Sequence, residues 1–281
     1  MRERMIVEDP RATGGEARRP RSVREREGRT RGRSRKRERL GFRERSERAL
    51  MDVGIYRFVP FRELAEAHFG GSRLTARRAV NTWIRQKLAR ETTVCGEDGR
   101  TFRLLSLTWR GVSVARDLTA ATKLDLDPGQ KFTHVLHIRR PYLPHDAALY
   151  RAAREERERL AREGARVRRV RLEDELRATV LRRRQLARAR SGQRGADAGR
   201  RSAARELTLP IDAEGGVLYP DAQIEYVDGE GRSGRVNIEV ASGHYKKRHI
   251  LAKAAAGFRL HADGPEGERL LGRLLSGGPG L

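Results

Sequence analysis

The sequence predicts an α+β protein with an N-terminal winged helix-turn-helix, a small α/β domain after it, and a disordered basic arm before it. Three observations support this fold class. Residues 1–45 are rich in Arg and Glu, residues 46–125 read as helices followed by a hairpin, and residues 217–241 alternate between apolar and polar side chains. The predicted segments are a basic arm 1–45, a winged helix-turn-helix 46–125, a linker 126–144, an α/β domain 145–263 and a flexible C-terminal tail 264–281.

The charge of the chain points to a polyanionic partner. Its 281 residues include 62 Lys and Arg against 38 Asp and Glu, a net charge of +24. Such an excess favours nucleic acid over a small-molecule substrate. The single cysteine, Cys95, excludes an internal disulfide and a cysteine-rich zinc site. With neither a membrane-length apolar run nor an apolar export signal, we expect a cytoplasmic, nucleoid-associated protein that contacts DNA and no membrane.

The first segment, residues 1–45, carries 17 basic and 8 acidic side chains, a net +9. Few apolar residues recur in it, so it is expected to be disordered. Two interpretations remain open: the arm makes sequence-independent phosphate contacts, or it is a solubilising tail from an arginine-rich genome.

Three helices and a hairpin follow the arm. The apolar positions of the helices are Ala49, Leu50, Val53 and Tyr56; then Phe61, Leu64, Ala65 and Phe69; then Ala76, Ala79, Val80, Trp83, Ile84 and Leu88. Gly70, Gly71 and Ser72 predict the turn and cap before the third helix. The strands around Thr92–Val94 and Phe102–Leu105 flank a turn at residues 96–99, and a short helix around Val112 follows. This order is typical of a winged helix-turn-helix.

The third helix has a cationic face suited to the major groove, where Arg binds guanine edges and Asn binds adenine. The side chains expected to contact DNA are Arg73, Arg77, Arg78, Asn81 and Arg85 on this helix, with Arg100 and Arg103 on the wing. The alternative is a winged fold used for protein contacts.

Residues 126–144 contain Asp127-Pro128-Gly129 and Pro141, which predict a linker. His134 and His137 within it are expected to be structural, because no third ligand lies at a clear spacing. Beyond the linker, the pattern predicts a helix from His145 to about residue 164, a strand at 167–172 and a helix opening at residues 173–175. The Arg-rich residues 187–206 are expected to form a flexible insertion or a frayed helix end.

The most informative segment is a hairpin with Ile224, Tyr226, Val236, Ile238 and Val240 on one face. Alternation then places Asp221 and Glu239 on the other face of neighbouring strands. Two carboxylates arranged in this way can form a Mg²⁺ site. The alternatives are a turn residue for Asp221 and an exposed carboxylate paired with Arg for Glu239.

Pro220-Asp221, followed by Glu239-Val240-Ala241, resembles the core of PD-(D/E)xK nucleases, which have a restriction-endonuclease-like α/β fold. Together with the winged helix, residues 46–261 resemble the replication-relaxation family of bacterial plasmids and mobile elements. His145-Asp146 would open the second domain of that family, and Glu173 or Glu175 would match its first acidic position. The resemblance implies a DNA-binding protein that acts in replication, mobilisation or its regulation, with itself or other mobile-element proteins as possible partners.

One position departs from the nuclease motif. Ala241 stands where the motif has a catalytic lysine, and Lys246, Lys247 or Lys253 would have to replace it. The resemblance therefore implies DNA binding more securely than cleavage. One alternative is a Mg²⁺-dependent endonuclease with Asp221, Glu239 and Lys247 as catalytic residues and the two carboxylates as metal ligands. The other is a non-enzymatic transcriptional regulator or adaptor. No cofactor besides Mg²⁺ is expected.

Overall fold

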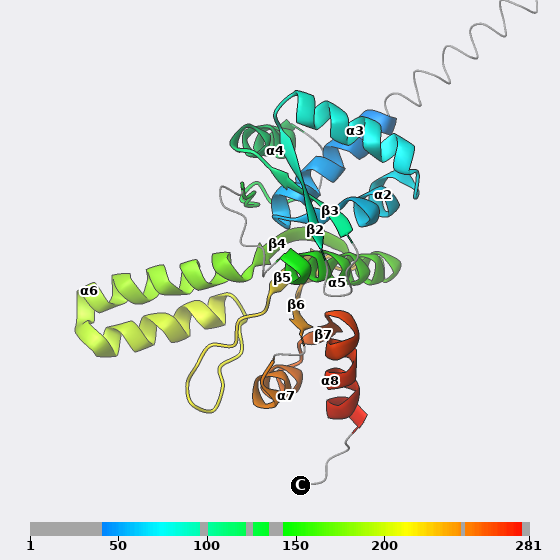
Figure 1. Ribbon diagram of the computed structural model, residues 1–281. Coiled ribbons are helices and arrows are strands. Elements are labelled where there is room, and N and C mark those ends of the chain that lie inside the picture. The colour runs from blue at the N-terminus through cyan, green and yellow to red at the C-terminus, as the bar shows by residue number, and fades with distance from the viewer. Residues whose placement is uncertain (1–40, 96–100, 122–125, 135–142, 243–244, 277–281) are drawn as a thin grey trace, which may run out of the picture. The chain divides into compact units, whose positions relative to one another are not determined.

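A computed structural model describes residues 41–95, 101–121, 126–134, 143–242 and 245–276. Helices and two β-sheets make up these residues, so the chain is an α+β protein (Figure 1). Both sheets belong to one unit, Glu44–Leu281. In the described part of the chain, no helix combines the length and apolar character needed to cross a membrane.

The first sheet has the strand order β1-β3-β2 and is antiparallel throughout. A helix over residues 41–55 precedes it, so residues 41–45 are helical and the predicted basic arm was too long by these residues. Residues 1–40 lie outside the described part of the chain. The remaining elements are β1 (Val59–Pro60), α2 (Phe61–Phe69), α3 (Arg73–Arg85), β2 (Ala89–Cys95), β3 (Thr101–Leu107) and α4 (Trp109–Ala121).

The local signals for α2 and α3 act as the sequence indicates. Gly70 ends α2 in the left-handed conformation, with φ 60°, which costs glycine nothing. The Ser72 hydroxyl caps α3 by accepting a hydrogen bond from the Thr75 amide at 3.3 Å. Ala76, Ala79, Val80 and Trp83 form the buried side of α3, as predicted, whereas Ile84 is 38% exposed.

The second sheet has the order β4-β5-β6-β7, with β6 and β7 parallel and the other pairs antiparallel. Helices separate its strands along the chain except between β5 and β6, which form a hairpin. The elements are α5 (Leu143–Arg162), β4 (Arg166–Leu172), α6 (Glu173–Glu206), β5 (Ala222–Val227), β6 (Ser233–Ala241), α7 (Lys247–Ala255), β7 (Arg259–Ala262) and α8 (Gly264–Ser276). Both strands of the predicted hairpin are present, and Gln223 pairs with Asn237 across it.

Two segments expected to be flexible are helical. Residues 187–206 belong to α6, which breaks at Ser191-Gly192 into two halves that run side by side (Figure 1). Residues 264–276 form α8 instead of a tail, because its Leu271 is buried with Ala241 and Ile250. Both predictions were wrong, for different reasons. The second half of α6 has a weak apolar pattern and is stabilised by packing against the first half, whereas α8 has an amphipathic pattern of its own, with Leu270, Leu271 and Leu274 on its packed side.

The predicted linker is held in place over residues 126–134. The Gln130 side chain donates to the Val170 carbonyl and accepts from the Val170 amide, both at 2.9 Å. Phe132 is buried, and the Thr133 amide donates to the Gly54 carbonyl at 2.8 Å. His134 contacts Trp109 edge to face with the ring centroids 4.7 Å apart. His137 lies outside the described residues.

A buried ion cluster connects α5 to the helix of residues 41–55 and to α2. One Asp52 carboxylate oxygen lies 2.9 Å from Arg157 Nη1, and the other lies 2.8 Å from His68 Nε2 and 3.3 Å from the Tyr150 hydroxyl. Burial by itself would raise the pKa of Asp52, but Arg157 and His68 outweigh it and hold this pKa well below its usual range. The cluster therefore stabilises the contact between elements that lie far apart in the sequence.

Candidate functional site

The exposed side of α3 is cationic and carries no acid. Arg73, Arg78, Asn81 and Arg85 are exposed, as the sequence predicts. Arg73 and Arg78 make no ion pair with any described residue, and α3 itself contains no Asp or Glu. An unneutralised row of arginines on an exposed helix is available to bind an anionic partner.

Arg77, also predicted to contact DNA, is instead engaged inside the protein. Its Nη1 lies 2.9 Å from both carboxylate oxygens of Glu91 on β2. Its guanidinium also stacks on the Phe61 ring, 4.1 Å from the centroid. The side chain is only 25% exposed, so its main contacts join α2, α3 and β2. On the β2–β3 hairpin, which the sequence predicts to be a wing, Arg103 is 56% exposed and lies 3.8 Å from the same Glu91, whereas Arg100 lies outside the described residues.

The structure brings Asp221 and Glu239 close together at the second sheet. Asp221 directly precedes β5, and its Oδ2 accepts a hydrogen bond at 2.8 Å from the amide of Val240, the neighbour of Glu239. Its Oδ1 lies 3.4 Å from His145 Nε2 at the start of α5. Asp146, next to His145, lies 3.6 Å from Arg57 instead.

Glu239 is buried, with 0% of its surface exposed, which overturns the alternative of an exposed carboxylate paired with Arg. Its Oε1 forms an ion pair with Lys253 Nζ from α7, and its buried Oε2 accepts no hydrogen bond from the described residues. Lys247, the lysine predicted for this site, is exposed in the first turn of α7. Lys253 points into the site because it lies six residues further along α7, on the side that faces the sheet.

The electrostatics of the pair follow from its burial. Burial and the nearby Asp221 carboxylate raise the pKa of Glu239 to about 7, against the opposing effect of the Lys253 ammonium. Burial alone would lower the pKa of His145, but the hydrogen bond and the charge of Asp221 raise it. A carboxylate whose pKa is shifted by burial and by a specific charged partner is typical of functional sites. Structural ion pairs also shift the pKa of a carboxylate.

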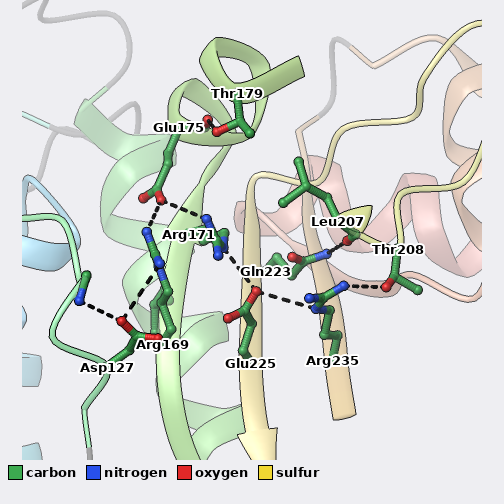
Figure 2. A network of polar contacts seen from close by, with 12 residues as sticks. Asp127, Arg169, Arg171, Glu175, Thr179, Leu207, Thr208, Gln223, Glu225 and Arg235 are labelled. Atoms are coloured by element: carbon green, nitrogen blue, oxygen red, sulfur yellow. Dashed lines mark hydrogen bonds and ion pairs between the residues drawn. The ribbon is translucent and has the colours of Figure 1, made fainter. Parts of the chain in front are cut away.

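The acids at the start of α6 do not join this pair. Glu175 accepts from Arg169 at 2.6 Å and from Arg171 at 3.1 Å, and Figure 2 shows it directed toward those arginines. Glu173 forms an ion pair with Arg177 at 2.6 Å. Neither acid therefore supplies a third carboxylate to Asp221 and Glu239.

Within the described ranges, no group of three or more His, Cys, Asp or Glu side chains is placed to hold a metal ion. The two carboxylates fit a Mg²⁺ site only in a minimal form. Mg²⁺ is often held by one or two carboxylates with water as the remaining ligands, and Glu239 has one unpartnered buried oxygen. Lys253 would share the other oxygen of Glu239.

A cavity of about 790 Å³ lies between α2, α3 and β3 on one side and α5, β6 and the start of α8 on the other. Five arginines line it: Arg62, Arg73, Arg77, Arg103 and Arg151. Its wall also includes Pro144 and Ser242, which are next in sequence to His145 and Ala241. The start of α3, with Arg73 and Arg77, and residues adjacent in sequence to His145 and Ala241 therefore border one cavity, whereas Asp221 and Glu239 are not among its lining residues.

No protein-family model, no curated protein and no solved structure matches this chain. The resemblance to the replication-relaxation family and to PD-(D/E)xK nucleases therefore depends on the residues quoted for it. What the chain does has to be inferred from its own geometry.

Proposed function

We propose that this chain binds duplex DNA, with α3 as the helix that enters the major groove. The observation that carries the proposal is the exposed face of Arg73, Arg78, Asn81 and Arg85, on a helix without a single acid. A hairpin, β2 and β3, follows α3, in the order expected of a winged helix-turn-helix. Arg103 on this hairpin is exposed on the wing and suited to phosphate contact.

The test is a triple variant on this face, Arg78→Ala with Asn81→Ala and Arg85→Ala, measured by fluorescence anisotropy on duplex DNA. Removing a side chain that binds a base edge should cost about 1–3 kcal/mol of binding free energy and relax sequence preference at one position. Arg77 is left intact, because its removal would disturb the packing against Glu91. The control is Arg48→Ala with Arg232→Ala, two exposed arginines that already have acidic partners. Unchanged DNA affinity in a folded triple variant would reject α3 as the reading helix.

The second half of the chain supports a relationship to PD-(D/E)xK proteins and, with α3, to the replication-relaxation family. Three antiparallel strands are followed by α7 and a parallel strand, β7, and α5 precedes them. Asp221 directly precedes the second strand of that series and Glu239 lies on the third, close to where the motif has its acids. On this basis we propose a role in plasmid or mobile-element replication, mobilisation or its regulation.

A second candidate function, Mg²⁺-dependent DNA cleavage, is favoured by one contact: Lys253 reaches Glu239. In this candidate, Lys253 from α7 takes the place of the lysine that Ala241 cannot supply. Asp221 and Glu239 would hold the ion, which would polarise the phosphate and its attacking water. Lys253 would orient Glu239, and His145 would hold Asp221 in position.

Cleavage is tested on supercoiled, linear and branched DNA with Mg²⁺ and with Mn²⁺. Activity that vanishes in Asp221→Asn and Glu239→Gln and survives in Lys247→Met would establish this site. Lys253→Met should lower the rate of any cleavage, and both metal ions should raise the melting temperature of the wild type but not of Glu239→Gln. Cleavage that persists in both carboxylate variants would place the active site elsewhere. DNA binding without cleavage would favour a non-enzymatic regulator or adaptor.

A further inference from the structure

The two halves of α6, joined at Ser191-Gly192, form a helical hairpin, called here the α6 hairpin. We propose that its outer part, around residues 188–194, is a second nucleic-acid contact, which binds the phosphate backbone without regard to sequence. The inference rests on the proposed function in one respect, that the polyanion is DNA. It concerns a surface far in sequence from α3 and one that the winged helix-turn-helix does not require.

The first observation is the charge of the hairpin. Between residues 181 and 205 there are nine arginines and one acid, Asp197. That acid lies 3.6 Å from Arg200, so it is already engaged. Six of the arginines are exposed and make no ion pair with any described residue: Arg182, Arg188, Arg190, Arg194, Arg201 and Arg205. Arg188, Arg190 and Arg194 flank the turn at Ser191-Gly192, so they gather at the tip of the hairpin.

The second observation is that the two halves of the hairpin are closely packed. A Cβ at Gly195 would lie 2.4 Å from the Ala187 carbonyl oxygen, and one at Gly199 would lie 2.5 Å from the Ala187 Cβ. Glycines four residues apart therefore let the two halves of α6 approach closely. Arginines on such a support keep their spacing, so that less conformational entropy is lost when they bind.

The base of the hairpin is clamped to the sheet at both ends, as Figure 2 shows. At its start, Glu175 pairs with Arg169 and Arg171 of β4. At its end, the Leu207 carbonyl accepts from Gln223 of β5 at 2.9 Å, and the Glu206 carbonyl accepts from Arg235 of β6 at 2.8 Å. The arginines of the sheet strands at this base are thus neutralised and structural, whereas Arg188, Arg190 and Arg194 at the tip are available.

The third observation argues for nucleic acid rather than a lipid surface. The apolar side of the hairpin is used internally, where Leu176 and Val180 pack with Ala203, Ala204 and Leu207. Residues 173–206 contain no aromatic side chain. A helix that binds a membrane surface presents a wide apolar face, usually with Trp or Phe. Here only Leu181 and Leu186 are exposed among the large apolar residues of the described hairpin. Arg guanidinium groups, in contrast, bind phosphate oxygens in a bidentate manner.

The experiment compares two full-length variants that lose the same charge. The first, Arg188→Gln with Arg190→Gln and Arg194→Gln, removes the tip arginines. The second, Arg48→Gln with Arg177→Gln and Arg232→Gln, removes exposed arginines that each have an acid four residues away. Binding to random-sequence duplex DNA is measured over a series of salt concentrations. Each phosphate contact contributes about 0.9 to the slope of log K against log salt, so the slope should fall by roughly 2 to 3 in the tip variant and by less than about 1 in the control.

Equal slopes for the two variants would overturn the proposal. So would weaker binding to phosphatidylglycerol vesicles with unchanged DNA binding, which would make the hairpin a lipid contact. The α3 triple variant separates the two proposals. If it keeps wild-type affinity and sequence preference while the slope falls in the tip variant, α3 is not the reader and the hairpin contact stands. If only the α3 variant is impaired, the hairpin proposal falls and the proposed function stands.

Discussion

The base and the tip of the α6 hairpin use the same residue type for opposite purposes. At the base, Arg171 lies between Glu175 and Glu225 at 3.1 and 3.0 Å, and Arg235 lies 3.4 Å from Glu225 (Figure 2). At the tip, Arg188, Arg190 and Arg194 are exposed and have no acidic partner among the described residues. The difference teaches that an arginine count alone does not locate a binding surface. Whether a group of arginines can bind an anionic partner depends on whether carboxylates from neighbouring elements have already neutralised them.

The largest expected effect comes from breaking the ion cluster around the buried carboxylate of Asp52. Asp52→Asn would leave Arg157 without its carboxylate partner and would weaken the hydrogen bonds of His68 and Tyr150. Removing one partner of a buried ion pair typically costs 3–5 kcal/mol, and because Arg157 is 33% exposed we expect about 3 kcal/mol. Urea denaturation at neutral pH measures this loss. A change below about 0.5 kcal/mol would show that water replaces the partner without cost.

The same pair predicts a pH dependence. Because the pKa of Asp52 is lower in the folded than in the unfolded protein, its contribution is present above the ordinary carboxyl pKa and is lost as the pH falls below it. Between about pH 4 and pH 2, the wild type should therefore lose more stability than Asp52→Asn. Parallel stability curves for the two proteins across that range would contradict the assignment.

A smaller effect is expected at the base of the hairpin. Glu175→Gln keeps the shape of the side chain but removes the charge that faces Arg169 and Arg171. Since Arg171 retains Glu225, we expect a loss of about 2 kcal/mol of unfolding free energy. Thermal unfolding followed by circular dichroism measures it, with Glu163→Gln as a control at an exposed carboxylate. Equal melting temperatures would mean that the base is not held by this network.

The smallest effect on stability is expected at the tip. Arg190→Gln removes an exposed side chain without an ionic partner among the described residues, so stability should change by less than about 0.5 kcal/mol. DNA affinity, in contrast, should fall. A tip variant that unfolds more easily than Glu175→Gln would reverse the comparison and make the tip a structural element.

Much of the fold could be predicted from local patterns. The helices around α2 and α3, the strands β2 to β6 and the start of α6 follow from period and turn chemistry. The sequence prediction failed where the conformation of a residue depends on a neighbour that is distant in the sequence. Ala187, Gly195 and Gly199 suggest flexibility in a linear sequence, yet they are the small residues that allow two helices to touch.

The candidate site shows the same division. Alternation along the two strands predicted that Asp221 and Glu239 share a face, and the structure brings them together with Asp221 directly before β5 rather than on it. It did not reveal that Glu239 is fully buried or that Lys253, rather than Lys247, reaches it. Helical spacing did not separate the two lysines, because Lys247 and Lys253 each lie three positions from the buried Ile250, and only the packing of α7 on the sheet decided which one reaches Glu239.

Arg77 and Arg78 mark the boundary between what the sequence by itself determined and what only the tertiary structure decided. The sequence determined the net charge of +24, the order of most elements and the cationic character of α3. Only the folded chain decided that Arg77 pairs with Glu91, fourteen residues away, while Arg78 stays exposed. Charge and hydrophobic period are local properties of a chain, whereas neutralisation of a charge depends on which distant carboxylate the packing of helices and strands brings within about 4 Å.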